Sequence, residues 1–175
     1  FTELQDDEAY YWVYAQYLDW GYFDHPPMIA VLIKWGSSIF GGELGVRFFP
    51  LLLNVLTLYL TEKLVAPKNL MLFYAVVLSA AVLQLIGYWA VPDIPLLFFT
   101  ALYFWCYQRW IKDFSIGNTL LFALACALLM YTKYHGALII IFTLLSNSKL
   151  LLRWQLWAAG VVALLLFAPH LYWQY

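Results

Sequence analysis

Charged side chains are scarce in this chain of 175 residues: only 11% are Asp, Glu, Lys or Arg, whereas 65% are hydrophobic. A soluble globular domain usually carries about 25% charged residues. The scarcity of charge therefore excludes an ordinary soluble domain. The apolar runs are long enough to span a lipid bilayer, which takes about 20 residues of helix, and they indicate a polytopic membrane protein.

Other features are also missing. The nine Lys and Arg residues form no basic stripe, and the formal net charge is −1, so a nucleic-acid partner is not expected. The Gly-rich phosphate loop of nucleotide-binding enzymes is absent. The two cysteines, Cys106 and Cys126, lie inside apolar runs, where buried thiols are more typical than a disulfide. Because the chain does not begin with Met and ends in LYWQY, we expect a piece of a longer protein, lacking an N-terminal membrane helix and a C-terminal part.

Apolar runs define the candidate membrane segments, which are residues 45–61, 69–90, 94–111, 117–131, 136–147 and 155–172. The fourth and fifth are short and are separated by TKYHG. They either cross the membrane or form a re-entrant pair, and both alternatives return the chain to the same side. Residues 27–40 are apolar but short and carry Lys34, which predicts a helix at the membrane interface.

The sequence therefore predicts an all-α, polytopic membrane helical bundle. Residues 1–175 would form a single transmembrane domain, with short amphipathic helices in an extracytoplasmic loop over residues 1–44 and about six membrane segments over residues 45–175. The chain is therefore expected to be an integral, multi-pass membrane protein.

The distribution of cations predicts the orientation, since cytoplasmic loops carry an excess of Lys and Arg. Threading the segments alternately places six cations on one side, namely Lys63, Lys68, Arg109, Lys112, Lys149 and Arg153. The other side holds three, Lys34, Arg47 and Lys133, together with eight of the ten acids. The side with six cations is predicted to be cytoplasmic, so the acids gather on the extracytoplasmic side.

The stretch DDEAYYWVYAQYLDWGYFDHPP, residues 6–27, contains five of these acids. The pattern of residues 7–18 predicts a helix with Asp6 or Asp7 as its N-cap, and the pattern Thr2-x-x-Gln5 offers a second possible cap just upstream. Asp7 shares one face with Tyr10, Tyr11 and Tyr14. Because a helix N-terminus favours negative charge, Asp7 is suited to orient a hydroxyl and accept its proton. The alternative is that Asp7 is only a cap and the tyrosines form an interfacial belt.

The same stretch ends in Asp24 and His25, just before two prolines. A carboxylate and an imidazole on a stiff segment could bind a divalent metal or a phosphate-bound cation. The alternative is a solvated turn.

Four further residues map to the extracytoplasmic side, namely Arg47, Asp93, Lys133 and His135. Each has a structural alternative, such as an N-cap for Asp93 or contact with lipid headgroups for the cations. Their convergence on one membrane face favours a site for an anionic amphiphile, because ionisable groups at that depth are usually functional. A transporter would place such groups in the middle of its spans, and a structural subunit would not need acids sorted to one face.

The motifs DDEAYYW, WGYFDHPPMIAVLI, GVRFFPLLLN, VPDIPLLFF and LLMYTKYHGALI together resemble the polyprenyl-phosphate-sugar-dependent glycosyltransferases of the GT-C superfamily. The resemblance covers nearly the whole chain, and its closest branch includes the protein O-mannosyltransferases, the lipid A aminoarabinose transferases and the Rgt-type enzymes. It implies an inverting transfer from undecaprenyl or dolichyl phosphate to a protein, lipid or glycan hydroxyl at the extracytoplasmic face, in contact with membrane lipids. The resemblance also implies a location in the bacterial inner membrane, with the active site facing the periplasm or the cell exterior.

The resemblance also implies roles for single residues. Asp7 and Glu8 match the catalytic Asp-Glu pair of the first extracytoplasmic loop. Asp24 matches an acid that helps to bind a metal, whereas His25 replaces the usual Lys. Asp93 and Lys133 match further site residues of the family. These matches add to the substrate-binding set predicted above, which is Tyr11, Asp24, His25, Arg47, Asp93, Lys133 and His135.

The predicted orientation can be tested by cysteine labelling in intact cells. Ser37→Cys and Ser148→Cys, each in a cysteine-free background, place one thiol on either side of the predicted bundle. We expect an impermeant maleimide to label position 37 and not position 148. Labelling of position 148 alone would reverse the orientation.

Overall fold

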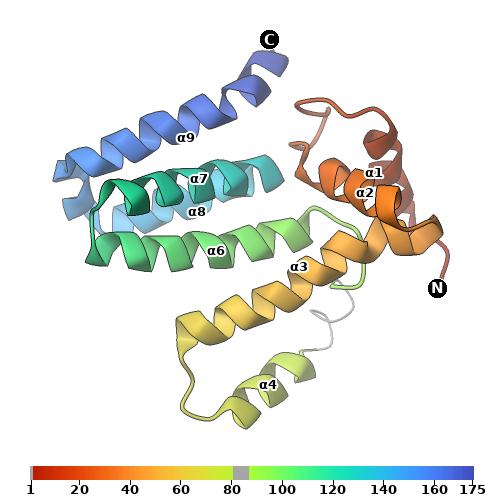
Figure 1. Cartoon of the computed structure of the whole chain (residues 1–175), viewed down its shortest axis with the longest axis horizontal. Helices are drawn as coiled ribbons and strands as arrows, with labels where there is room; N and C mark the ends of the chain where they lie inside the picture. Colours follow the sequence, from red (N-terminus) through yellow and green to blue (C-terminus); the bar gives the residue numbers. More distant parts are fainter. Residues whose placement is uncertain (1, 81–86) are drawn as a thin grey trace. The chain divides into compact units, whose positions relative to one another are not determined.

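The computed structural model describes residues 2–80 and 87–175, and every regular element in these ranges is a helix (Figure 1). The elements are α1 (Asp6–Gln16), α2 (Met28–Ile39), α3 (Gly42–Val65), α4 (Leu70–Ser79), α6 (Asp93–Lys112), α7 (Ile116–Thr132), α8 (His135–Ser146), the 3₁₀ helix η1 (Ser148–Leu152) and α9 (Trp154–Trp173). The all-α prediction is therefore confirmed for the described residues. The number of membrane crossings stays a prediction.

Two of the described helices, α3 and α9, are long and apolar enough to cross a membrane by length and composition. The predicted segments 94–111, 117–131, 136–147 and 155–172 correspond closely to α6, α7, α8 and α9. The predicted interfacial helix over 27–40 corresponds to α2. Hydrophobic run length therefore located most of the helices.

The helix predicted over residues 69–90 is shorter than expected. Asn69 caps its start by accepting a hydrogen bond from the backbone N–H of Leu72 (3.0 Å), and α4 ends at Ser79. Part of the predicted segment, residues 81–86, lies outside the described residues. Residues 87–92 form turns and a bend that lead into α6. The uniform apolar composition gave no signal for where the helix stops.

The chain divides into two compact units. The first unit contains residues 1–18 and Met28–Phe98, and the second contains Asp19–Pro27 and Phe99–Tyr175. The loop between α1 and α2 therefore belongs to a different unit from the helices on either side of it.

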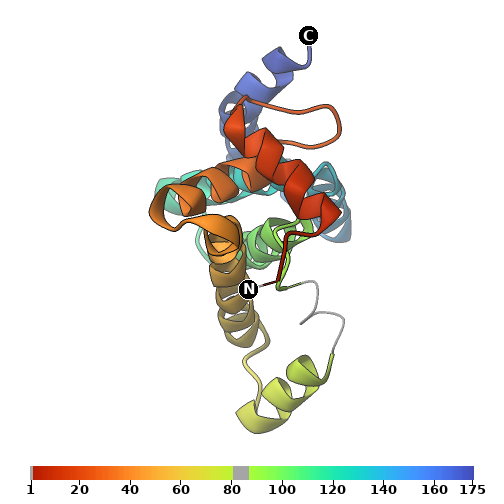
Figure 2. The same ribbon diagram turned by 90° about the vertical axis from the view of Figure 1, so that its right-hand side faces the viewer.

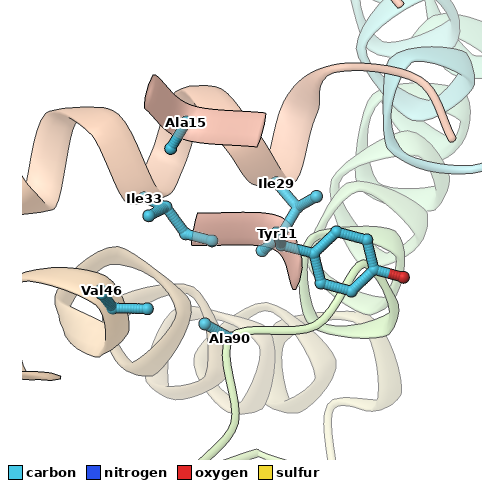
Figure 3. Packing of buried hydrophobic residues seen from close by; sticks show 6 residues of the cluster. All are labelled: Tyr11, Ala15, Ile29, Ile33, Val46 and Ala90. Atoms are coloured by element: carbon cyan, nitrogen blue, oxygen red, sulfur yellow. The ribbon is translucent and has the colours of Figure 1, made fainter. Parts of the chain in front are cut away.

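In the first unit α1 packs on α2, and α2 packs on α3 (Figures 1 and 2). Their shared core is a cluster of buried side chains from all three helices and the segment before α6 (Figure 3), namely Tyr11, Ala15, Ile29, Ile33, Val46 and Ala90. Glycine permits the contact between α2 and α3, because a Cβ on Gly36 would lie 2.1 Å from the carbonyl oxygen of Gly45. The core thus holds α1 and its acidic first turn against α3.

In the second unit α7 packs on both α8 and α9. Trp110 of α6 stacks on Phe122 of α7, with ring centroids 4.7 Å apart, and its indole N–H donates to the Thr119 hydroxyl (3.1 Å). The buried Ala159 and Ala163 of α9 are small residues of the kind that let membrane helices approach closely. Cys106 and Cys126 are buried free thiols, as predicted.

Candidate functional site

The acidic stretch of the sequence begins α1. The helix starts at Asp6 with Gln5 as its N-cap, so the prediction that Asp6 or Asp7 caps the helix is wrong. The Glu8 carboxylate accepts a hydrogen bond from the backbone N–H of Gln5 (3.0 Å), which is half of a capping box. Glu8 therefore helps to cap the start of α1, a role that the sequence pattern had given to Asp6 or Asp7.

Glu8 and Arg47 form a buried ion pair in the first unit. Both side chains are 0% exposed. The guanidinium of Arg47 donates from Nε to Oε1 of Glu8 (2.7 Å) and from Nη2 to Oε2 (2.6 Å). This bidentate geometry is among the strongest hydrogen-bonded arrangements available to side chains.

The rest of the Arg47 guanidinium is used within the same network. Nη1 donates to the Thr2 carbonyl (2.9 Å) and to the Tyr88 hydroxyl (3.0 Å), while Nη2 also donates to the Glu3 carbonyl (3.0 Å). All five donor positions of Arg47 therefore have a partner. The predicted phosphate contact of Arg47 would require this network to open.

The network joins segments that are far apart in sequence. Glu8 Oε1 also accepts from the backbone N–H of Ala90 (3.0 Å), 82 residues away. Through Glu8 and Arg47, the start of α1, the N-terminal part of α3 and the segment before α6 are tied together. A proton-accepting role for Glu8 would disturb all three contacts.

The environment of Glu8 sets its charge state. Burial acts to raise the pKa of the Glu8 carboxyl, but the hydrogen bonds from Arg47 and from the backbone of Gln5 and Ala90 outweigh burial and lower the pKa from its ordinary value of 4.5. Glu8 is thus held as a carboxylate paired with a cation, which suits a structural role better than proton transfer.

Asp7 has a different environment. Its side chain is exposed and borders a hollow of about 310 Å³ lined by Gln5, Asp6, Asp7, Glu8, Trp89 and Val91. The two neighbouring acids therefore differ in burial. Glu8 points into the protein, and Asp7 is accessible at the hollow. An incoming hydroxyl group can reach Asp7 without breaking the ion pair.

The three tyrosines predicted to share a helix face with Asp7 also differ in burial. Tyr11 belongs to the buried core, and its hydroxyl points away from the rest of the cluster (Figure 3). The hydroxyls of Tyr10 and Tyr14 contact each other on the exposed side. The three tyrosines therefore contribute both to the core and to the surface of α1.

In the second unit, Asp24 and His25 form a pair within the loop of residues 19–27. His25 Nδ1 lies 2.9 Å from Asp24 Oδ2, with the side chains 17% and 34% exposed respectively. Among the described residues, no group of three or more His, Cys, Asp or Glu side chains is placed to hold a metal ion. Asp24 and His25 alone do not make a metal site, so a metal at Asp24 stays a prediction.

The remaining predicted residues lie at helix ends. Asp93 is the first residue of α6 and is half-buried, in the first unit. In the second unit, Lys133 is half-buried between α7 and α8, and His135 begins α8 on the surface. The structure thus brings Glu8 together with Arg47, and Asp24 together with His25. The roles of Asp93, Lys133 and His135 stay predictions.

One buried polar residue was missed by the sequence reasoning. His170 of α9 is 0% exposed, and its Nδ1 lies 2.7 Å from the carbonyl oxygen of Trp20, 150 residues away. A histidine inside an otherwise apolar run was the available signal, because ionisable residues in such runs are rare.

The described residues 2–80 and 87–175 are helical in all their regular elements, two of these helices are long and apolar enough to cross a membrane, and in the first unit an accessible acid lies beside a buried ion pair. Residues 24–173 match the model of the dolichyl-phosphate-mannose-protein mannosyltransferase family. The chain belongs to this family of GT-C type, which confirms the resemblance found in the sequence motifs.

Two relatives come from Rhizobium johnstonii. The chain is 28% identical to the lipid A galacturonosyltransferase RgtD over 99% of its length, and 27% identical to the lipopolysaccharide core galacturonosyltransferase RgtA over 97% of its length. The chain spans only 39% and 37% of these two relatives, respectively. No solved structure matches the chain.

Because Arg47 is buried and paired, even substitutions that keep the size of its side chain should destabilise the protein strongly. Arg47→Lys keeps the charge but has fewer donors in a different geometry, so it leaves carbonyl partners unsatisfied, and Arg47→Met leaves Glu8 buried without a cation. We expect Arg47→Met to lower the free energy of unfolding by about 3–5 kcal/mol, because an uncompensated buried charge is costly. Thermal unfolding of the full-length protein in detergent measures this loss.

Lys63→Ala is the control, because Lys63 pairs with Glu62 at 3.3 Å on the surface and is half exposed, and it should change the unfolding temperature little.

The lowered pKa of Glu8 adds a pH dependence to the stability of the protein. Its stabilising contribution is fully present above pH 4.5 and is lost as the pH falls through the folded-state pKa. The difference in the free energy of unfolding between the wild type and Glu8→Gln should therefore become smaller as the pH falls below 4.5. Equal effects of Arg47→Met and Lys63→Ala would contradict the buried pair.

Proposed function

We propose that the whole protein is an inverting glycosyltransferase that moves a sugar from a polyprenyl phosphate to an acceptor hydroxyl at the extracytoplasmic membrane surface. The family match over residues 24–173 supports glycosyl transfer. The observation that carries the assignment of the chemistry is the separation of Asp7, exposed at a hollow, from Glu8, which is locked in an ion pair.

In this proposal Asp7 orients and deprotonates the acceptor. The acceptor oxygen attacks the anomeric carbon from the face opposite the phosphate and forms a new C–O bond. The old bond to the phosphate oxygen breaks with both electrons, and polyprenyl phosphate leaves as an anion. The acceptor proton passes to Asp7, so atoms and charge balance, and the attack from the opposite face inverts the anomeric configuration.

A cation must stabilise the departing phosphate. We propose Lys133 for this role, because it is predicted to lie on the extracytoplasmic side and matches a site residue of the family that the sequence motifs resemble. An ammonium group can act there as a point charge on phosphate. Asp24 and His25 are proposed to contact the donor or a cation bound to its phosphate.

The names of the relatives guide the choice of substrate. Because RgtD and RgtA are named as galacturonosyltransferases of lipid A and of the lipopolysaccharide core, we propose a glycolipid acceptor of the lipopolysaccharide class and a donor that carries galacturonic acid. Assay of the full-length protein with labelled polyprenyl-phosphate sugars tests both, because the lipid consumed identifies the donor and the labelled product identifies the acceptor.

Asp7→Asn tests the base. Asn keeps the shape and a hydrogen-bonding oxygen but cannot take up the proton, and Gln5 remains the N-cap. We expect transfer to fall about 10²–10⁴-fold, measured as the rate with a saturating polyprenyl-phosphate sugar. Asp6→Asn, at an adjacent exposed acid that borders the same hollow, should be mild. An Asp7→Asn protein that folds, binds donor and turns over at the wild-type rate would end the assignment.

The phosphate contact is tested at Lys133. Lys133→Ala should weaken use of the donor, seen as a higher KM for the lipid, because a cation opposite the phosphate is removed. Lys149→Ala is the matched control, since Lys149 lies in η1 on the predicted cytoplasmic side. If the two substitutions change donor KM equally, Lys133 has no place in the site.

A further inference from the structure

His170 is a buried histidine that the proposed chemistry does not use. It follows Pro169 near the end of α9 and is 0% exposed. Its ring Nδ1 lies 2.7 Å from the carbonyl oxygen of Trp20 in the loop of residues 19–27. Both residues belong to the second unit.

This contact fixes the tautomer of His170. A carbonyl oxygen can only accept a hydrogen bond, so Nδ1 must carry the proton. In the neutral ring Nε2 is then an acceptor, and it faces the Tyr134 hydroxyl at 3.4 Å and the Gln174 amide nitrogen at 3.3 Å. Gln174 also donates to the Tyr134 hydroxyl (2.8 Å). His170 is thus oriented from both sides, with its N–H directed at the loop.

The loop backbone also packs directly against α9. A Cβ at Gly21 would lie 2.5 Å from Cε3 of Trp173 and 2.8 Å from Nδ1 of His170. The Trp173 ring is stacked on the His170 ring, with centroids 6.3 Å apart. Glycine at position 21 is therefore required for the hydrogen bond between His170 and Trp20 to form.

Hydrogen bonds within the loop connect this anchor to Asp24 and His25. The Tyr22 N–H donates to the His25 carbonyl (3.0 Å), and the Asp19 N–H donates to the Tyr22 hydroxyl (3.2 Å). Tyr22 is buried, and Pro26 and Pro27 stiffen the end of the loop. A loop this short and internally bonded moves as one piece when its anchor is released.

We propose that His170 is a positioning residue that holds the loop of residues 19–27 on α9 and so places the Asp24 and His25 pair for donor binding. The inference rests on the proposed function only in giving Asp24 and His25 a donor to contact. The anchoring itself depends on the N–H at Nδ1 of His170. A side chain that only filled space between the loop and α9 would not need this N–H.

Two substitutions of His170 separate these roles. The side-chain amide of Asn places its nitrogen near the position of Nδ1, whereas the longer Gln places its nitrogen near Nε2. His170→Asn should therefore retain the bond to the Trp20 carbonyl, and His170→Gln should lose it. Gly21→Ala leaves His170 in place but separates the loop from α9. Tyr172→Phe, at an exposed site on the same helix, is the control.

The first measurement is hydrogen–deuterium exchange of peptides covering residues 19–27 in the full-length protein. Loss of one buried hydrogen bond should raise exchange in the loop on the order of tenfold. We expect this rise in His170→Gln and Gly21→Ala, and values near the wild type in His170→Asn and Tyr172→Phe. The second measurement is sugar transfer, in which the first two variants should raise donor KM more than they lower kcat.

Equal loop exchange in His170→Asn and His170→Gln would overturn the proposal, because a space-filling role does not depend on which nitrogen is retained. Faster loop exchange with unchanged donor KM would also overturn it, since the loop would then not position donor contacts. Failure of the proposed function gives a different result. The wild type would transfer no sugar from any polyprenyl phosphate, while loop exchange would still depend on residue 170, which would support the anchor and reject the glycosyltransferase assignment.

Discussion

The buried ion pair between Glu8 and Arg47 is the interaction on which the first unit depends. It connects the start of α1 to α3 and, through the backbone N–H of Ala90, to the segment before α6. Removing either partner would leave a charge without a counterion in a place that water does not reach, which is far more costly than losing an exposed pair. The pair therefore fixes the acidic first turn of α1 in one orientation.

That orientation gives two adjacent acids different environments. Because successive residues of a helix point in different directions, Glu8 faces the protein while Asp7 borders the hollow. A structural carboxylate and an accessible carboxylate are thus placed side by side on one helix turn. In the proposed reaction, the rigidity that Glu8 and Arg47 supply is what keeps Asp7 at a constant position while substrates enter and leave.

The sequence predicted local features well and long-range contacts poorly. Long apolar runs located α3, α6 and α9, and the short apolar run before Gly41 located α2, because these patterns are read over neighbouring residues. Asp6 and Asp7 were wrongly predicted as the N-cap, because the cap is Gln5, within the pattern Thr2-x-x-Gln5 that was the upstream alternative. The partnership of Glu8 with Arg47 spans 39 residues, and that of Trp20 with His170 spans 150. No local pattern encodes such partners, so the pairing of Arg47 with Glu8 and the burial of His170 were not predicted, while the phosphate contact of Arg47 stays a prediction.

The central claim is that Arg47 serves the fold through Glu8, which leaves Asp7 to act on the acceptor. The most direct test is a cryo-electron-microscopy structure of the full-length protein with a non-hydrolysable polyprenyl-phosphate sugar bound. The account predicts that the bidentate contact between Arg47 and Glu8 remains closed, as in the structure described here, and that the Asp7 carboxylate faces the sugar. A structure in which Arg47 has left Glu8 to bind the phosphate would contradict it.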